Sequence, residues 1–194
     1  MINKVLTVLK NQLNGSEGLQ DVLGEITVVD DIAKHDGEAS GLDDKVVITL
    51  LNVEEESTLK NMSGYTKKKI SETPPRYEMK MESTPAYLNL YVMISANRAT
   101  YANALANISK VIEVFQAKNV MEYKDPANNH DKDFSFRIEL HSVPFDQLSY
   151  IWGLLGGKVL PSALYKISVI KIMADDLIPI ELINEVNIKD IKVN

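Results

Sequence analysis

The chain has 194 residues, of which 45% are hydrophobic and 25% are charged, and it contains no cysteine. A chain of this length buries enough apolar surface to form a core without metals or disulfides. The lack of cysteine excludes disulfide frameworks, cysteine zinc sites and thiol nucleophiles, and it favours a reducing, intracellular origin. The apolar runs are only a few residues long, which excludes a membrane-spanning helix. Residues 1–10 lack the features of a signal peptide, so we expect them to belong to the mature protein.

The formal net charge of −6 is unevenly distributed. The stretch from Glu17 to Lys60 holds twelve acidic and three basic residues, a balance of −9, so the rest of the chain carries +3. Nucleic-acid-binding domains usually present a basic stripe, and this balance argues against that function. We interpret the acidic stretch as a solvated edge; a cation site and a contact surface for a basic partner are the alternatives.

The first third of the chain predicts one helix followed by two strands. Apolar residues recur at helical spacing, and Asn14-Gly15 predicts a helix end at a residue in the left-handed conformation. Residues 25–29 form a short β-branched run, and residues 45–53 predict a buried strand after a loop rich in aspartate and glycine. The helical positions are Ile2, Val5, Leu6, Leu9 and Leu13.

Residues 54–84 show little apolar periodicity and contain Gly64 and Pro74-Pro75. We expect a long loop or an extended excursion here, and loops of this length are usually functional or disordered. The run Lys67-Lys68-Lys69 within it is either a solvated surface or a contact.

The second half of the chain predicts alternating strands and helices. Strands are expected at 86–94, 134–140 and 163–173. A helix is expected over 98–118, capped by Asn97, with one apolar row formed by Tyr101, Leu105, Ile108, Ile112 and Phe115. A second helix has Pro144 in its first turn and Gly156-Gly157 at its end, and its shared apolar side consists of Phe145, Leu148, Trp152 and Leu155.

These elements predict an α+β protein, a single domain with a mixed or antiparallel sheet and helices packed mainly on one face. We place this domain at residues 1–174, with the excursion 54–84 inside it. Residues 175–194 are expected to form a C-terminal strand or arm, although the periodicity of 178–194 does not distinguish helix from strand.

None of the catalytic or ligand-binding motifs considered is complete in this sequence. The three histidines are too far apart for a zinc-protease helix. Residues 125–133 lack the glycine and glutamate of a calcium-binding loop, and residues 153–159 lack the first glycine and the hydroxyl of a phosphate-binding loop. Ser57 and Ser168 each precede a lysine by three residues, but the other motifs of penicillin-binding enzymes are absent. We therefore assign no catalytic, cofactor-binding or metal-binding residue, and an enzyme built on scattered residues is the alternative.

Three stretches in series carry a resemblance to a known family: residues 44–56, residues 88–116, and residues 148–166 with their Trp152-Gly153 and Gly156-Gly157-Lys158 segments. In order and spacing the chain resembles the cap, or tail-terminator, proteins of contractile injection systems such as the Photorhabdus virulence cassette and the antifeeding prophage. The resemblance covers most of residues 1 to about 174. Family members often carry a longer C-terminal extension, so roles attributed to that extension are not expected of this chain.

The resemblance implies a non-enzymatic structural protein without a cofactor. Six copies would form a ring on the end of the inner tube and sheath distal to the baseplate, where the ring stops polymerisation and fixes particle length. The implied partners are other copies of the chain and the tube and sheath subunits, with no nucleic acid and no membrane insertion. The implied location is the bacterial cytoplasm during assembly and then the particle. A tail-completion or connector protein of a related phage-like particle is the first alternative, and a small-molecule enzyme with a lid loop is the second.

A ring requires interfaces in which one patch of a subunit meets a different patch of its neighbour. One way to build them is a donated strand, because an open sheet edge offers unpaired backbone groups. We therefore expect 178–194 to be such an arm or an edge strand of its own chain, and 54–84 to reach a neighbour or the tube or to be a flexible loop. The expected assembly contacts are Lys67, Lys68, Lys69, Ile180, Leu182, Ile188 and Ile191.

Overall fold

The computed structural model describes residues 1–15, 26–34, 41–56, 65–72, 75–82, 86–127, 133–172 and 177–180. The chain divides into two compact units, each made of two stretches of sequence. The first unit combines Met1–Glu55 with Leu88–Ile170, and the second combines Glu56–Tyr87 with Lys171–Asn194. The first unit has the α+β architecture that the sequence predicted.

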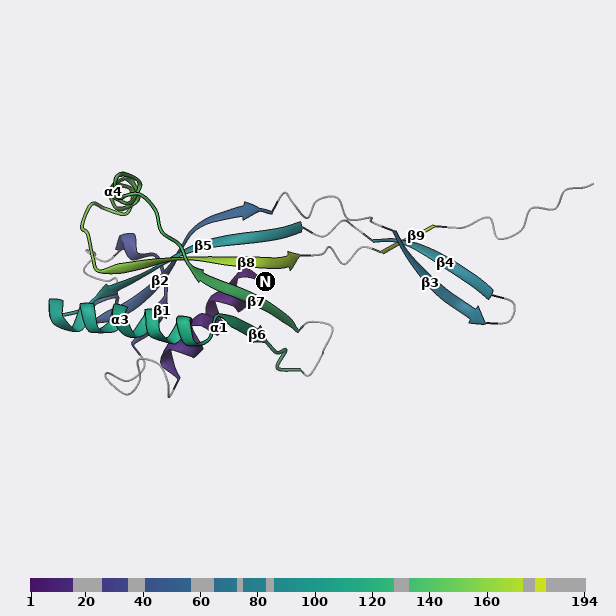
Figure 1. Cartoon of the computed structure of the whole chain (residues 1–194), viewed down its shortest axis with the longest axis horizontal. Helices are drawn as coiled ribbons and strands as arrows, with labels where there is room; N and C mark the ends of the chain where they lie inside the picture. The colour runs from purple at the N-terminus through teal and green to yellow at the C-terminus, as the bar shows by residue number, and fades with distance from the viewer. Residues whose placement is uncertain are drawn as a thin grey trace, which may run out of the picture. The chain divides into compact units, whose positions relative to one another are not determined.

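The first unit is built on a six-stranded mixed sheet (Figure 1), as predicted. The order across the sheet is β1-β2-β5-β8-β7-β6. The short edge strand β1 runs parallel to β2, whereas β2 and β5, β7 and β8, and β6 and β7 are antiparallel pairs. The strands are β1 (Thr27–Val29), β2 (Lys45–Glu55), β5 (Ala86–Asn97), β6 (Val120–Tyr123), β7 (Phe134–Leu140) and β8 (Ser162–Ile172). Of these, only β6 was not predicted.

Helices α1 (Ile2–Asn14) and α3 (Tyr101–Ala117) cover one face of this sheet, and α4 (Phe145–Leu154) lies on the other (Figure 1). Most of the helical residues are therefore on one face, as predicted. Successive residues of a strand point to opposite faces. On β8, Tyr165 meets the ring of Phe115 on the α3 side, whereas Leu164 joins a cluster on the α4 side. That cluster also contains Trp152 of α4, Val47, Met93, Leu42, and Ile32 of the 3-10 turn η1 (Ile32–Lys34).

Helix α1 ends at Asn14 as predicted, but not in the predicted conformation. Gly15 has φ −72° and ψ 172°, which is extended rather than left-handed. Glycine is favoured there for space: a Cβ would lie 3.3 Å from the carbonyl oxygen of Asn11 and 3.4 Å from that of Gln12. The Asn14 side chain is directed away from the helix end and bonds to the backbone of β1.

Helix α3 is present where predicted, but its cap and its buried face differ from the prediction. The cap is Thr100, whose hydroxyl accepts a bond from the Asn103 amide at 3.3 Å, while Asn97 remains in β5 and donates to the Leu42 carbonyl. The buried residues are Ala104, Asn107, Val111, Val114 and Phe115. Small side chains let the helix approach the sheet closely, so most of the larger predicted row is turned toward solvent.

Helix α4 also matches its predicted range, with Pro144 preceding rather than occupying the first turn. Trp152 is buried, but Phe145 is exposed, so the predicted shared apolar side is wrong at its first position. The helix ends at the glycine pair as predicted. Gly156 adopts a left-handed conformation with φ 100°, and the Gly157 amide donates to the Trp152 carbonyl at 2.8 Å. This six-to-one bond satisfies a terminal carbonyl.

The second unit contains a three-stranded antiparallel sheet in the order β3-β4-β9. Its strands are β3 (Tyr65–Glu72), β4 (Pro75–Glu82) and β9 (Leu177–Ile180). Of the two alternatives for 54–84, a loop is wrong for residues 65–72 and 75–82, which form a hairpin, whereas an extended excursion is compatible with it. Strand β3, with its run of three lysines, gives no alternation, but in β4 the residues Tyr77, Met79 and Met81 alternate with charged residues, a signal that the prediction missed. The pairing places residues of opposite charge, such as Lys68 and Glu78, directly across from each other.

Candidate functional site

One edge of the first unit's sheet is largely uncovered. Strand β1 pairs with β2 only from Val46 to Ile48, but β2 continues to Glu55 along β5. Among the described residues, no strand pairs with the β1 side of Leu50–Glu54. An edge of this kind presents backbone donors and acceptors to another chain.

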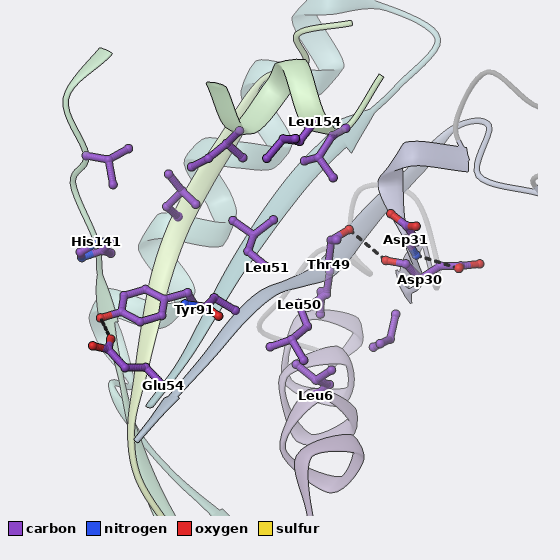
Figure 2. A pocket seen from close by; sticks show the side chains of 17 residues that line it. Leu6, Asp30, Asp31, Thr49, Leu50, Leu51, Glu54, Tyr91, His141 and Leu154 are labelled. Carbon is purple, nitrogen blue, oxygen red and sulfur yellow. Dashed lines mark hydrogen bonds between the residues drawn. The ribbon is translucent and has the colours of Figure 1, made fainter. Parts of the chain in front are cut away.

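A groove of about 890 Å³ runs along this part of β2 (Figure 2). Its lining is mainly aliphatic, with Leu50 and Leu51 from β2 and Leu154 from α4 among the labelled side chains. Leu6 of α1 borders the groove below β2. An apolar floor beside open backbone groups is suited to a peptide segment rather than to a small polar ligand.

One end of the groove is formed by a polar cluster of three residues from different elements. The Tyr91 hydroxyl donates to Oε2 of Glu54 at 2.9 Å, and the ring of Tyr91 meets that of His141 edge to face, with centroids 5.1 Å apart (Figure 2). The carboxylate accepts a hydrogen bond from a phenol that is itself held by an aromatic contact. This end of the groove therefore offers a fixed acceptor to an approaching donor.

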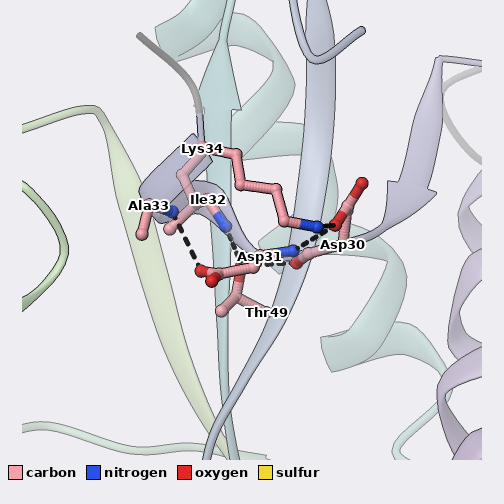
Figure 3. Close-up of polar contacts among 6 residues, drawn as sticks. All are labelled: Asp30, Asp31, Ile32, Ala33, Lys34 and Thr49. Atoms are coloured by element: carbon pink, nitrogen blue, oxygen red, sulfur yellow. Dashed lines mark hydrogen bonds and ion pairs between the residues drawn. The ribbon is translucent and has the colours of Figure 1, made fainter. Parts of the chain in front are cut away.

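The other end is the acidic turn Asp30–Lys34 (Figure 3). Oδ1 of Asp30 accepts from the Asp31 amide at 2.7 Å and from Nζ of Lys34 at 2.9 Å, and Oδ1 of Asp31 accepts from the Ala33 amide at 2.9 Å. The hydrogen bond from Lys34 lowers the pKa of Asp30, and the same bond raises the pKa of Lys34.

The Thr49 hydroxyl ties this turn to β2. It accepts from the Ile32 amide at 3.1 Å and donates to the Asp30 carbonyl at 2.9 Å (Figure 3). Two carboxylates of the acidic stretch are thus used to build the turn. They form part of the rim of the groove, and their hydrogen bonds to Lys34 and to backbone amides account for their position.

The predicted contact residues fall in the second unit where they are described. Lys67, Lys68 and Lys69 lie on β3, and Ile180 is the last residue of β9, opposite Met79 of β4. The structure thus brings the lysine run and Ile180 into one sheet. Residues 177–180 form an edge strand on their own chain. The other predicted contacts, Leu182, Ile188 and Ile191, lie outside the described residues.

Sequence reasoning missed the groove residues Glu54, Tyr91 and His141. The sequence held a partial signal of the uncovered edge. The strand predicted at 45–53 is much longer than the run at 25–29 that pairs with it, so part of the longer strand lacks a partner on that side. Nothing in the sequence pattern indicated that His141, more than 80 residues from Glu54, would close the same groove.

None of the helices in the described part of the chain is long and apolar enough to span a membrane.

Comparison with known proteins gives the family. Residues 4–182 match the model of the Pvc16 N-terminal domain. No curated protein sequence matches the chain. The fold is similar to the PVC sheath/tube terminator of an extracellular contractile injection system in its extended state, with a TM-score of 0.58 and 11% identity over 100% of this chain and 65% of that one.

The fold is also similar to the tube-terminating cap of the anti-feeding prophage, with a TM-score of 0.59 and 11% identity over 97% of this chain and 61% of that one. The chain thus spans less than two thirds of the length of both terminators. At this identity the likeness shows a shared fold. The family match covers most of the chain and confirms the resemblance drawn from its three stretches: the chain belongs to the Pvc16 N-terminal domain family.

Proposed function

We propose that this chain is a non-enzymatic structural subunit that caps the distal end of the tube and sheath in a phage-tail-like contractile injection system. Six copies form a ring that ends polymerisation and fixes particle length. The observation that carries the proposal is the family match over residues 4–182, together with a fold shared with two terminators of such particles. In this account the subunit assembles in the bacterial cytoplasm and remains part of the particle.

The first part of the proposal concerns the C-terminal segment. Residues 177–180 pair with β4 of their own chain, so a donated arm would begin beyond them. The arm would then be residues 181–194, whose periodicity does not by itself distinguish helix from strand, and the proposal takes them as a strand. The uncovered edge of β2 and its apolar groove supply a receptor for such a strand on a neighbouring copy.

The second part concerns the hairpin β3–β4. It carries Lys67, Lys68 and Lys69 in succession on one strand, a concentration of positive charge in an acidic chain. Contact between this strand and an acidic surface of a tube subunit or a neighbour would be salt-sensitive. In a ring of six copies, each with a net charge of −6, local pairing of this kind offsets the repulsion between subunits.

The proposal is tested by removing the protein from a particle-producing system. Particles should then become overlong or unstable when viewed by electron microscopy, and the full chain should restore normal length. A variant ending at residue 180 separates the arm from the fold: it should stay folded by circular dichroism but lose ring formation. Rings that survive this truncation would refute the arm, and particles of normal length without the protein would refute the terminator function.

The charge argument has its own test. Ring assembly or docking to tube ends should weaken as salt rises from low to molar concentration, and replacing Lys67, Lys68 and Lys69 with glutamine should reduce that dependence. Indifference to salt in the unsubstituted protein would contradict this use of the charge.

A further inference from the structure

The open edge of β2 fixes where an added strand can lie. The Val46 amide and the Ile48 carbonyl form hydrogen bonds of 3.1 and 3.3 Å with the backbone of residues 26–30, so these groups face β1. Backbone groups alternate in direction along a strand, and those of Leu50 therefore face the same side. No described strand pairs with that side of β2 beyond Ile48. An added strand would continue the line of β1 beside residues 50–54.

The two faces of β2 differ along this edge. On the groove face, the carboxylate of Glu54 lies at one end (Figure 2). Toward the acidic turn it is followed by an aliphatic floor that includes Leu51 and Leu154. On the other face, Val53 is 40% exposed. A strand that fills the groove therefore needs a hydrogen-bond donor followed by apolar side chains in one row, whereas its other row can carry charge.

Glu54 is held in place but lacks a counter-charge. The Tyr91 hydroxyl donates to its Oε2 at 2.9 Å, and the Tyr91 ring is itself in contact with the His141 ring. Among the described residues, no lysine or arginine forms an ion pair with Glu54. A fixed carboxylate of this kind at the end of an apolar groove favours a cationic side chain in the occupant.

The proposed arm, residues 181–194, contains two lysines. Side chains alternate in a strand, so Lys192 shares its row with Asp190 on one side and Asn194 on the other. With Lys192 at Glu54, either direction of the strand would place a polar side chain over the aliphatic floor. Lys192 therefore does not fit the groove.

The other lysine, Lys189, fits the groove in one direction. The two residues that follow it in the same row, Ile191 and Val193, are apolar, whereas the two that precede it in that row are polar. The aliphatic floor is covered only if the strand runs from the Glu54 end toward the acidic turn. This direction is antiparallel to β2.

We propose that the arm of one copy lies in the β2 groove of the next copy as a strand antiparallel to β2, with Lys189 opposite Glu54. Ile191 then lies opposite Asn52, and Val193 covers the aliphatic floor. This inference rests on the donated arm of the proposed function, and it adds the direction of the arm, its register and its charged contact.

The neighbouring registers fit worse. A shift by one residue moves every side chain of the arm to the other face and brings Ile188 or Asp190 opposite Glu54. A shift by two residues removes the lysine from the carboxylate. In the proposed register Asp190 lies opposite Val53 on the exposed face, so its carboxylate stays in water. The pattern of charged and apolar residues thus selects one register.

The lack of native cysteine makes this register testable by disulfide formation. Opposite residues in an antiparallel pair have Cα atoms about 4.5–5.5 Å apart, within the range that a disulfide spans. Full-length Asn52→Cys and Ile191→Cys, mixed and mildly oxidised, should give a disulfide-linked dimer, and each alone should give little. The control is Asp190→Cys, one position away but on the opposite face, which should not link to Asn52→Cys. No dimer in the first mixture, or an equal yield in the control, would overturn the register.

A full-length chain that carries both Asn52→Cys and Ile191→Cys distinguishes a neighbour's arm from the chain's own. Oxidation should link several chains into a ladder on a denaturing gel, because each groove holds the arm of another copy. A product that migrates as a single chain and has lost its free thiols would mean that the arm lies in its own groove, and exchange between copies would be refuted.

Charge reversal gives a second readout. Glu54→Lys and Lys189→Glu should each weaken self-association by about 5-fold or more, because a favourable pair becomes a repulsive one. The full-length double variant should return to within about twofold of the unsubstituted chain. Lys192→Glu makes the same change of charge on the opposite row and should also stay within about twofold. A double variant that remains as weak as the single variants would contradict the contact between Lys189 and Glu54.

The outcomes separate the register from the ring. If rings form and are lost on truncation at residue 180, but give no disulfide and ignore the charge variants, the register is wrong while the arm and the ring stand. If the unsubstituted chain is monomeric at every concentration and on tube ends, the ring fails and the register fails with it.

Discussion

The substitution Asn14→Ala tests how the end of α1 holds the edge of the sheet. The Asn14 side chain bonds twice to the backbone of Thr27 on β1: Nδ2 donates to the Thr27 carbonyl at 3.1 Å, and Oδ1 accepts from the Thr27 amide at 3.0 Å. Asn14 is 8% exposed and Thr27 1% exposed. The Asn14 side chain thus makes the pair of hydrogen bonds that a neighbouring strand would make on this side of β1, and the opposite side of β1 pairs with β2.

Alanine would leave the Thr27 amide and carbonyl buried without these partners. Each unsatisfied buried group costs about 1–3 kcal/mol, so with partial access of water to the gap we expect a loss of about 2–4 kcal/mol in the free energy of unfolding. For a protein of this size the melting temperature should fall by roughly 4–16 °C. The measurement is thermal and urea unfolding followed by far-UV circular dichroism.

The matched control is Asn11→Ala, the same chemical change at an exposed position of the same helix. It should alter the free energy of unfolding by less than about 0.5 kcal/mol. If Asn14→Ala and Asn11→Ala are equally stable, the bidentate bond to β1 does not support the sheet edge and the reasoning is refuted.

Three further predictions concern the core and two titrating groups. Trp152→Ala should lower the free energy of unfolding, measured in urea, by about 3–5 kcal/mol. Trp152→Phe should lower it much less, because no described group forms a hydrogen bond with Nε1. Equal losses in the two variants would contradict this. The pKa of Asp30, measured by NMR, should lie below its ordinary value of 3.8 and should rise in Lys34→Met. The contribution of this pair to the free energy of unfolding is present above pH 3.8 and is lost as the pH falls through the folded-state pKa. An Asp30 pKa that is unchanged in Lys34→Met would exclude Lys34 as the cause of the shift. Burial raises the pKa of Tyr165 to about 12. An alkaline spectrophotometric titration should therefore show one tyrosine that ionises near pH 12, and Tyr165→Phe should remove it. The contribution of the neutral phenol to the free energy of unfolding is complete below about pH 10 and is lost as the pH rises toward 12.

Strand and helix positions in the first unit were largely predictable because each has a local signal. The β-branched run at 45–53 and the alternation at 134–140 place β2 and β7 within two residues of their observed ends. The glycine pair after α4 marks its end, because Gly156 must adopt a left-handed conformation. Signals of this kind depend on the residue and its immediate neighbours.

The buried face of α3 was not predictable from periodicity because two neighbouring rows of the helix are apolar. Leu105 and Ile112 are larger than Ala104 and Val111, and counting hydrophobic residues favours the larger row. The sheet selects the smaller one because it packs closer. Of the row that the sequence indicated as core, only Phe115 is buried, whereas Tyr101, Leu105 and Ile112 are exposed.

The hairpin at 65–82 and the groove on β2 depend on tertiary pairing. Strand β4 carries a local signal that the prediction missed, because Tyr77, Met79 and Met81 alternate with charged residues. Strand β3, with its run of three lysines, carries none, and the register of the hairpin is set by the partner strands. The groove exists because β1 stops at Val29 while β2 continues to Glu55. It is closed by His141, from a part of the chain that no local pattern links to β2.

The most direct test of the central claim is native mass measurement of the purified full-length chain, combined with electron microscopy of the same sample. The account predicts six-fold rings with a mass of about 130 kDa, six times the 21.7 kDa of one chain. A monomer at every concentration that also fails to bind the ends of purified tubes would contradict it.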